Sequence, residues 1–279
     1  MDPVTQLANT ARVALGPRAG DRTLSVEEIR AVVTASAGLV SLTTGQTIGE
    51  PEIEAATRNL EALFVVAQGP SIRLQSDQLP PPWYLGEARR PGDYLRRYLQ
   101  KLAEDGWAPR ALEVLEESTS EVMELIDDPT RPGPWDWRGL VVGNVQSGKT
   151  AHYAGLINRA ADAGYRVIIV LAGMHNVLRR QTQLRLDQDF LGFDTAGISG
   201  TGGRRPIGVG LLPGPVMLVD SLTTSQLGGD FNRTVAQNSN FAPGERPFIF
   251  VVKKNGGVLK TSTAGSRVSR RTRATRHCW

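Results

Sequence analysis

Residues 139–171 read GLVVGNVQSGKTAHYAGLINRAADAGYRVIIVL, and this stretch decides the predicted fold. The short apolar run Leu140–Val142 predicts a strand, and a glycine-rich turn follows it. Helical spacing then continues to Ala163, and Gly164 is expected to end the helix. Val167–Leu171 is continuously apolar, as expected for a strand buried on both faces of a parallel sheet. The order strand, helix, strand predicts an α/β core.

The turn between the predicted strand and helix matches the phosphate-loop pattern G-x-x-x-x-G-K-[ST]. Its residues are Gly143, Asn144, Val145, Gln146, Ser147, Gly148, Lys149 and Thr150. In such a loop the backbone amides surround a phosphate, and the following helix directs its N-terminal amides at the anion. We expect Lys149 to reach the β- and γ-phosphates of ATP and the Thr150 hydroxyl to ligate Mg²⁺. The sequence therefore predicts an ATP site in which these two side chains carry the chemistry.

Further segments extend the predicted core. A helix is expected from about Asn176 to Asp189, and residues 192–214, which hold eight glycines, are expected to be largely loop. Val216–Val219 and Phe248–Val252 are apolar runs typical of strands. We therefore predict an α/β fold with an incomplete parallel sheet of the P-loop NTPase class.

A phosphate-loop hydrolase also needs an acid at the end of a neighbouring strand, which holds Mg²⁺ through water. Asp220 follows the predicted strand Val216–Val219 and is the candidate for this role. The alternative is that Asp220 is a loop residue that caps the next segment. Ser221 comes next, where a hydrolase usually has the glutamate that orients the attacking water.

Three arginines lie in the helix predicted after the second strand, namely Arg179, Arg180 and Arg185. In a helicase-like motor a nucleic-acid backbone is often held at this place, because arginine pairs well with phosphate. These residues are therefore candidates for DNA contacts. The alternative is that they form an ordinary solvated helix face.

The N-terminal part of the chain is predicted to be mostly helical. Ser25 and Glu28 have the spacing of a capping box, and Leu24 and Ile29 flank it as a hydrophobic staple. From composition and from the proline- and glycine-rich breaks we divide the chain into a helical N-terminal region (1–78), a helical lead-in (79–133), the partial core (134–260) and a basic disordered tail (261–279).

The composition is that of a soluble globular protein, with 279 residues, a formal net charge of +4 and 40% hydrophobic residues. No apolar run approaches the roughly 20 residues of a membrane helix, so we expect a cytoplasmic location without membrane contact. Residues 261–279 hold five arginines and no acid, so the basic character belongs to the tail. The single cysteine, Cys278, excludes an internal disulfide and a multi-cysteine metal site.

Residues 139–192 resemble the opening of the Z-one domain (Z followed by the numeral one), a prokaryotic family labelled as endonucleases. VQSGKT at 145–150 and LAGMHNVLRRQTQLRLD at 171–187 carry the resemblance, which covers roughly residues 80–260. It implies a RecA-like core of the superfamily-two helicase type that uses ATP and Mg²⁺ and acts on DNA. Members are encoded beside restriction-modification and phage-defence genes, often with MORC-like ATPases, which the resemblance implies as partners.

The chain departs from the family pattern after Phe248–Val252 and a few further residues. Family members continue to a DDEAD-like acidic motif that orients water, whereas residues 261–279 are rich in arginine, serine and threonine. We expect ATP binding with little or no turnover, and one hypothesis for the ending is a frameshift near codon 260. The alternatives are an endonuclease subunit, an inactive truncated fragment, or a small-molecule kinase with Arg204 and Arg205 as lid arginines.

Overall fold

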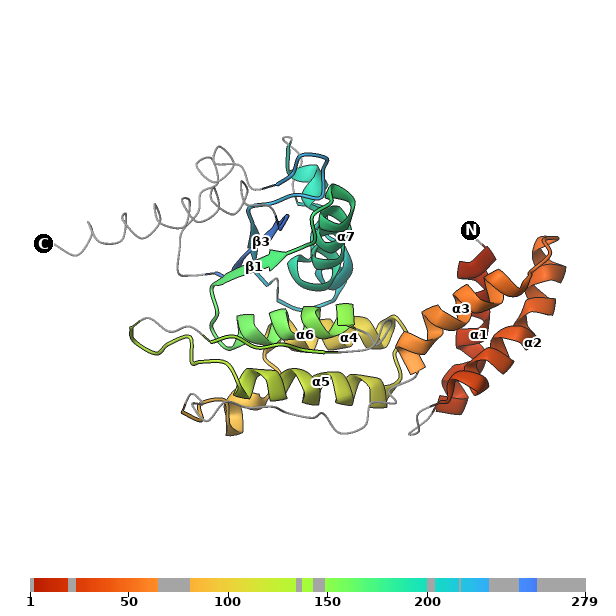
Figure 1. The fold of residues 1–279 in the computed structure, drawn as a ribbon, viewed down its shortest axis with the longest axis horizontal. Coiled ribbons are helices and arrows are strands. Elements are labelled where there is room, and N and C mark those ends of the chain that lie inside the picture. The colour runs from red at the N-terminus through yellow and green to blue at the C-terminus, as the bar shows by residue number, and fades with distance from the viewer. Residues whose placement is uncertain are drawn as a thin grey trace, which may run out of the picture. The chain divides into compact units, whose positions relative to one another are not determined.

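The computed structural model is mixed α/β, rich in helices, and contains one three-stranded parallel sheet (Figure 1). The structure describes residues 3–19, 24–64, 81–133, 137–142, 149–199, 204–215, 217–230 and 246–254. The predicted phosphate-loop residues 143–148 and the predicted tail 261–279 lie outside these ranges. Two compact units are present, one formed by residues 1–90 and 99–156 and the other by residues 91–98 and 157–279.

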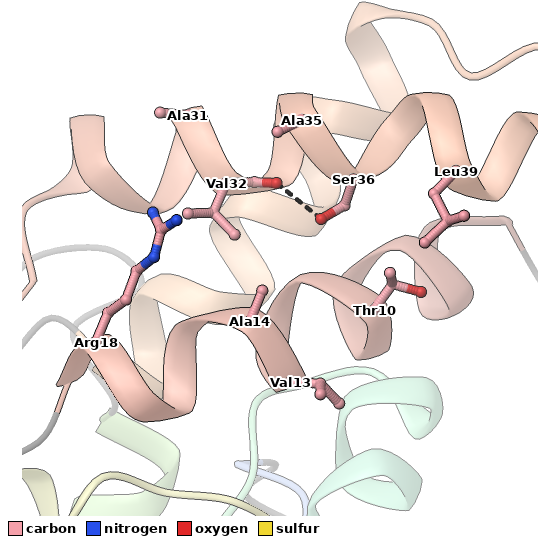
Figure 2. A pocket seen from close by; sticks show the side chains of 9 residues that line it. All are labelled: Thr10, Val13, Ala14, Arg18, Ala31, Val32, Ala35, Ser36 and Leu39. Carbon is pink, nitrogen blue, oxygen red and sulfur yellow. Dashed lines mark hydrogen bonds between the residues drawn. The ribbon is translucent and has the colours of Figure 1, made fainter.

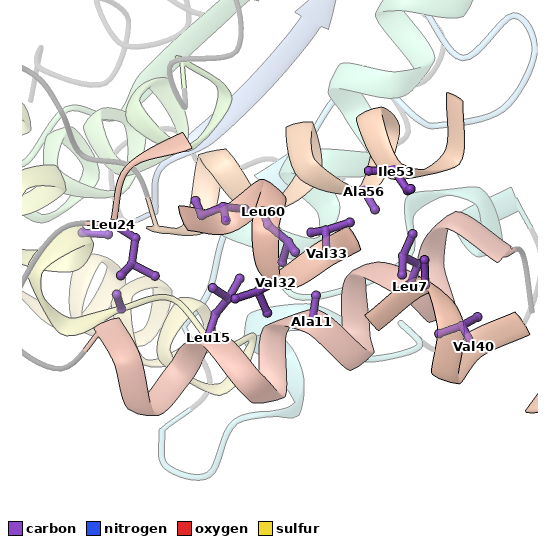
Figure 3. Packing of buried hydrophobic residues seen from close by; sticks show 14 residues of the cluster. Leu7, Ala11, Leu15, Leu24, Val32, Val33, Val40, Ile53, Ala56 and Leu60 are labelled. Carbon is purple, nitrogen blue, oxygen red and sulfur yellow. The ribbon is translucent and has the colours of Figure 1, made fainter. Parts of the chain in front are cut away.

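The first unit begins with three helices that lie side by side: α1 (Pro3–Ala19), α2 (Val26–Thr44) and α3 (Glu50–Phe64) (Figure 1). Apolar residues at helical spacing on each helix face the same centre (Figure 3). The fully buried members are Leu7, Ala11, Leu15, Ile29, Val33 and Ala56. Burial of these side chains is the main stabilising contribution to the bundle.

The predicted capping box at the start of α2 is confirmed. The Ser25 hydroxyl accepts a hydrogen bond from the Glu28 amide at 3.2 Å, and the Glu28 carboxylate accepts one from the Ser25 amide at 2.8 Å. Leu24 and Ile29 are both buried, as the staple requires. Gly45 ends the helix with φ +70°, a conformation that glycine adopts without steric cost.

The first unit also holds α5 (Pro109–Glu124), together with parts of α4 (Asp93–Glu104) and α6 (Lys149–Asp162). Asp127, just after α5, is almost fully buried and accepts a hydrogen bond from the Trp137 indole at 2.9 Å. Burial by itself would raise the pKa of Asp127, but the hydrogen bonds from Trp137, the Asp128 amide and Arg131 lower it below its usual value.

The second unit contains the sheet, in the order β1 (Val167–Leu171), β3 (Phe248–Val252), β2 (Asp220–Ser221). All pairs are parallel, and Phe248 pairs with Val167 on one side and with Asp220 on the other. The predicted strands at 167–171 and 248–252 are confirmed at their predicted bounds. The strand predicted at 216–219 is displaced, because β2 begins only at Asp220.

Helix α7 (Asn176–Leu186) follows β1, and a π-helical turn, Asp187–Leu191, continues it (Figure 1). This agrees with the predicted helix from about residue 176 to 189. The loop predicted at 192–214 contains two short 3₁₀ turns, Thr195–Ser199 and Gly208–Leu211, within its described part.

The prediction that β1 is buried on both faces is wrong. Every residue of β3 is buried, whereas Val167, Ile169 and Leu171 of β1 remain 48–51% exposed. β3 pairs with β1 along its whole length and with β2 over its first two residues, and helix α7 also contacts it, while β1 pairs with β3 alone among the described strands. A continuous apolar run therefore identifies a strand but does not determine how many neighbours cover it.

The predicted strand Leu140–Val142 is also wrong. Residues 137–142 have no regular secondary structure, and all three apolar side chains are more than half exposed. A strand this short is stabilised only by hydrogen bonds and packing from neighbouring strands, and among the described strands none pairs with it.

Candidate functional site

Helix α6 begins at Lys149, so the prediction that the phosphate-loop motif opens a helix is confirmed for its last two residues. Thr150 lies in the first turn and is exposed, which leaves its hydroxyl accessible to a ligand. The first-turn amides of a helix lack intrahelical partners and carry the positive end of the helix dipole. The start of α6 therefore has the properties that an anion-binding site requires.

The face of α6 behind this start packs closely on α5. Ala151 and Ala154 are buried, and Gly155 leaves no spare room. A Cβ atom at Gly155 would lie 3.3 Å from the Thr119 methyl group and 3.5 Å from a Leu115 methyl group. The small residues after the motif thus fix the helix that would carry Lys149 and Thr150.

His152 stands one turn along α6 from Lys149. Burial lowers the pKa of His152, although a hydrogen bond with the Ser118 backbone opposes the change. The imidazole is therefore held neutral by its surroundings. This environment is that of a packing or hydrogen-bonding histidine.

The last residue of α6 is held by the start of α4. The Asp162 carboxylate accepts the backbone amides of Tyr94 and Leu95 at 3.0 and 2.9 Å. A Cβ atom at Gly92 would overlap the Asp162 carboxyl group, so a larger residue there would displace the carboxylate. Burial raises the pKa of Asp162 even though both amides oppose the change.

The premise that Asp220 ends a strand is wrong, because β2 begins at Asp220. Its pairing with Phe248, the first residue of β3, sets it at the amino end of the sheet. Ligands of open α/β sheets bind at the carboxyl ends of the strands. The Asp220 carboxylate also accepts a hydrogen bond from Arg204 at 2.8 Å, and Arg204 in turn lies 4.4 Å from the centre of the Phe193 ring. This arrangement does not favour a magnesium role.

Arg179 is buried rather than presented to solvent. Its guanidinium donates to the Thr224 and Gln226 carbonyls at 2.9 and 3.0 Å and pairs with Asp230 at 3.2 Å. Burial lowers the pKa of Arg179, while Asp230 opposes the change. The side chain holds the loop after β2 in place, which explains an arginine here without a nucleic acid.

The two other candidate arginines are more accessible. Arg180 is exposed, and the structure leaves it free to meet a phosphate. Arg185 is 38% exposed and forms an ion pair with the fully buried Asp189. The sequence placed the three arginines in one helix, but their side chains have different surroundings.

A buried polar network on α7 was not predicted. The Asp187 carboxylate accepts hydrogen bonds from the Thr195 hydroxyl at 2.6 Å and the Gln183 amide at 2.8 Å. Thr223 donates to Gln183 at 2.7 Å and accepts the Val251 amide of β3 at 2.9 Å. Burial raises the pKa of Asp187. The spacing of Gln183 and Asp187 on one helix face was the only signal for this network, and it does not reveal the partners.

Arg97 of α4 holds the glycine-containing segment before β2. Its guanidinium donates to the carbonyls of Val209 at 2.6 Å, Leu212 at 3.2 Å and Pro215 at 3.1 Å. Arg97 and Arg179 thus both bind backbone carbonyls of loops in this unit.

Within the described residues, no group of three histidine, cysteine or acidic side chains could hold a metal ion. Among the described helices, none combines the length and apolar character that crossing a membrane requires. Comparisons with models of protein families, with curated proteins and with solved structures found no match to this chain.

Proposed function

We propose that this chain binds ATP with Mg²⁺ through the segment Gly143–Thr150. The observation that supports this most strongly is that the motif's last two residues, Lys149 and Thr150, begin a helix whose rear face is packed against α5. A phosphate-loop pattern in a different local setting, such as mid-helix, would carry no such implication.

The residues fit the proposed ligand in their chemistry. The exposed Thr150 hydroxyl is an oxygen donor of the type that Mg²⁺ prefers. The ammonium of Lys149 would neutralise phosphate charge, and the first-turn amides of α6 would add the positive end of the helix dipole. In such a site Mg²⁺ screens the charge of the phosphates, while the protein orients them.

We further propose that the chain corresponds to the N-terminal part of a helicase-like, DNA-acting motor of a cytoplasmic restriction or phage-defence system. The parallel sheet with helix α7 after its first strand is compatible with such a core. The resemblance to the Z-one domain family supplies DNA and MORC-like ATPases as proposed partners. Arg180, the most exposed of the three candidate arginines, is the first choice for a DNA contact.

Binding without turnover is the activity that we expect of this chain. Asp220 is committed to Arg204 and lies at the amino end of β3, so it is poorly placed to hold Mg²⁺ for hydrolysis. This position favours binding of the nucleotide over its hydrolysis.

Isothermal titration of the full chain with ATP, with and without Mg²⁺, tests the proposal. Wild type should bind Mg²⁺-ATP, and Lys149→Ala should lose at least about tenfold in affinity, equivalent to about 1.4 kcal/mol. Lys254→Ala, an exposed lysine after β3, is the matched control and should bind as wild type. Thr150→Val should weaken binding only when Mg²⁺ is present.

The same proteins separate the alternative activities. ATP hydrolysis that DNA stimulates and Lys149→Ala abolishes would indicate a working motor. Metal-dependent DNA cleavage that survives Lys149→Ala would indicate the endonuclease instead. Absence of Mg²⁺-ATP binding by folded wild type would overturn the proposal.

A further inference from the structure

Helix α5 holds the chain on both sides of the proposed nucleotide segment, residues 143–150. Before this segment, the Trp137 indole donates a hydrogen bond to Asp127, which lies just after α5. Beyond the segment, α6 packs against α5 at Gly155. All of these residues belong to the same compact unit. The chain is therefore attached to one helix and its end both before and after the segment.

The contact at Gly155 fixes the distance between α6 and α5. Thr119 is fully buried, and a Cβ atom at Gly155 would lie 3.3 Å from its methyl group. Protein interiors are packed so closely that one added methyl group displaces its neighbours. Because α6 runs without interruption from Lys149 through Gly155, a displacement at Gly155 also moves the first turn of the helix.

His152 connects the same two helices at a position closer to Lys149. Its imidazole forms a hydrogen bond with the Ser118 backbone, next to Thr119. The contacts at His152 and Gly155 lie about one turn apart on α6. Two successive turns thus hold the beginning of α6 on α5.

Asp127 fixes the chain before the segment. Its carboxylate is almost fully buried and accepts the Trp137 indole at 2.9 Å and the Asp128 amide at 3.0 Å. Arg131 forms an ion pair with the same carboxylate. A hydrogen bond to an ionised acceptor is roughly twice as strong as one between neutral groups. Trp137 is thereby held at the end of α5.

The affinity for a ligand depends on how much of its site is ordered before the ligand arrives. Groups that must be ordered on binding reduce the affinity, whereas groups that the folded chain already fixes do not. We propose that α5 positions the nucleotide site, with Thr119 and Asp127 as positioning residues that act through α6 and through Trp137. The inference rests on the proposed binding of Mg²⁺-ATP at residues 143–150. Both side chains are buried, so each acts on the nucleotide through the chain that it holds.

Calorimetric titration of the full chain with Mg²⁺-ATP tests the contact at Gly155. Gly155→Ala places a methyl group against Thr119 and should weaken binding about threefold. Thr119→Ser removes the opposing methyl group but keeps the hydroxyl, which donates to the Leu115 carbonyl at 2.8 Å. In the double variant it should restore the affinity of wild type. Alanine favours a helix more than glycine does, so loss of helix stability would not explain the effect of Gly155→Ala.

The same titration tests the hydrogen bond before the segment. Asp127→Ala and Trp137→Phe each remove one partner and should weaken binding by about threefold to tenfold. The double variant should bind no more weakly than the weaker single variant, because both changes remove the same bond. Asp127→Asn keeps an acceptor for the indole and should bind more tightly than Asp127→Ala.

Val32→Ala is the control that separates positioning from stability. Val32 is buried in the three-helix bundle, where it lines a pocket between α1 and α2 (Figure 2). The variant should have a lower melting temperature, because the truncation leaves a cavity, and it should bind Mg²⁺-ATP as wild type does. Circular dichroism checks the fold of every variant, and Trp137→Phe tests the hydrogen bond if Asp127→Ala does not fold.

The outcomes distinguish this inference from the proposed function. Absence of Mg²⁺-ATP binding by folded wild type would overturn both. Binding by wild type with unchanged affinity in Gly155→Ala, or in both Asp127→Ala and Trp137→Phe, would overturn the positioning role alone. Loss of affinity that neither Thr119→Ser nor Asp127→Asn restores, or an equal loss in Val32→Ala, would also overturn it, since reduced stability would then be the cause.

Discussion

Strands β1 and β3 have the same length and nearly the same composition, yet their surroundings differ. VIIVL and FIFVV pair in register over all five residues. β3 is buried throughout and helix α7 contacts it, whereas one face of β1 is half exposed. The difference shows that two similar apolar runs in one sheet can be buried to different degrees.

The largest difference is expected when one isoleucine is truncated in each strand. Ile249→Ala in β3 should destabilise the chain by about 3 kcal/mol, since the fully buried side chain leaves a cavity. Ile169→Ala in β1 should cost less than about 1 kcal/mol, because half of its surface is already in water. Urea unfolding followed by circular dichroism measures both. Equal losses would mean that the β1 face is covered in solution.

The next largest loss of stability is expected when the hydrogen bonds between Thr223 and β3 and between Thr223 and α7 are removed. Thr223→Val removes the acceptor of the Val251 amide and the donor to Gln183, all of which are buried. An unsatisfied buried amide costs about 1–3 kcal/mol, which should appear as a lower urea midpoint. Thr182→Val, on the exposed side of α7, should change the midpoint much less. A midpoint that stays unchanged in Thr223→Val would contradict this hydrogen bond.

A smaller loss is expected at the residue that ends the helix before β1. Asp162→Ala leaves the Tyr94 and Leu95 amides without their acceptor, so it should cost about 1 kcal/mol, as loss of a helix cap does. Glu87→Ala, an exposed acid, is the control. Thermal unfolding of the two variants in parallel would reveal the difference, and identical melting curves would argue against the cap.

The loss of folding stability at acidic pH that His152 causes should be smaller than the loss in Asp162→Ala. Burial lowers the pKa of His152 in the folded chain, so the unfolded chain takes up a proton first as the pH falls through about 6.5. Stability should therefore decrease between pH 7.5 and 5.5, and it should decrease less in His152→Gln. Urea midpoints across this range give the measurement. A parallel pH dependence in both proteins would indicate that His152 is solvated.

The smallest change in stability is expected for Ile169→Lys, which sharpens the comparison most. The residue is half exposed on an open strand, so the free energy of unfolding should change by less than about 0.5 kcal/mol. A charge on an edge strand also opposes pairing with other chains, so the variant should remain soluble at higher concentration. Ile249→Lys, the same change in the fully buried β3, should prevent folding.

Sequence patterns predicted correctly those structural features that depend on interactions between neighbouring residues. The capping box at Ser25 and Glu28 and the bounds of β1 and β3 follow from neighbouring residues, and the structure has them as predicted. Features that depend on residues far away in the sequence could not be predicted from it. Leu140–Val142 is as apolar as a strand but pairs with none among the described strands, and Arg179 meets its carbonyl partners 45 residues or more away.

For the proposed nucleotide site, the sequence supplied the motif and the start of α6, since both reside in consecutive residues. It could not supply the second acid. Whether Asp220 ends or begins a strand depends on its pairing with Phe248, and its charge is taken by Arg204, 16 residues earlier. Neither the strand pairing nor the hydrogen bond can be predicted from the residues next to Asp220.

Hydrogen exchange of the full chain, with and without Mg²⁺-ATP, tests the central claim most directly because it locates the ligand as well as detecting it. The account predicts slower exchange in peptides that cover residues 143–156, and no such slowing in Lys149→Ala. Protection elsewhere in the chain without protection of these residues, or equal protection in Lys149→Ala, would contradict it.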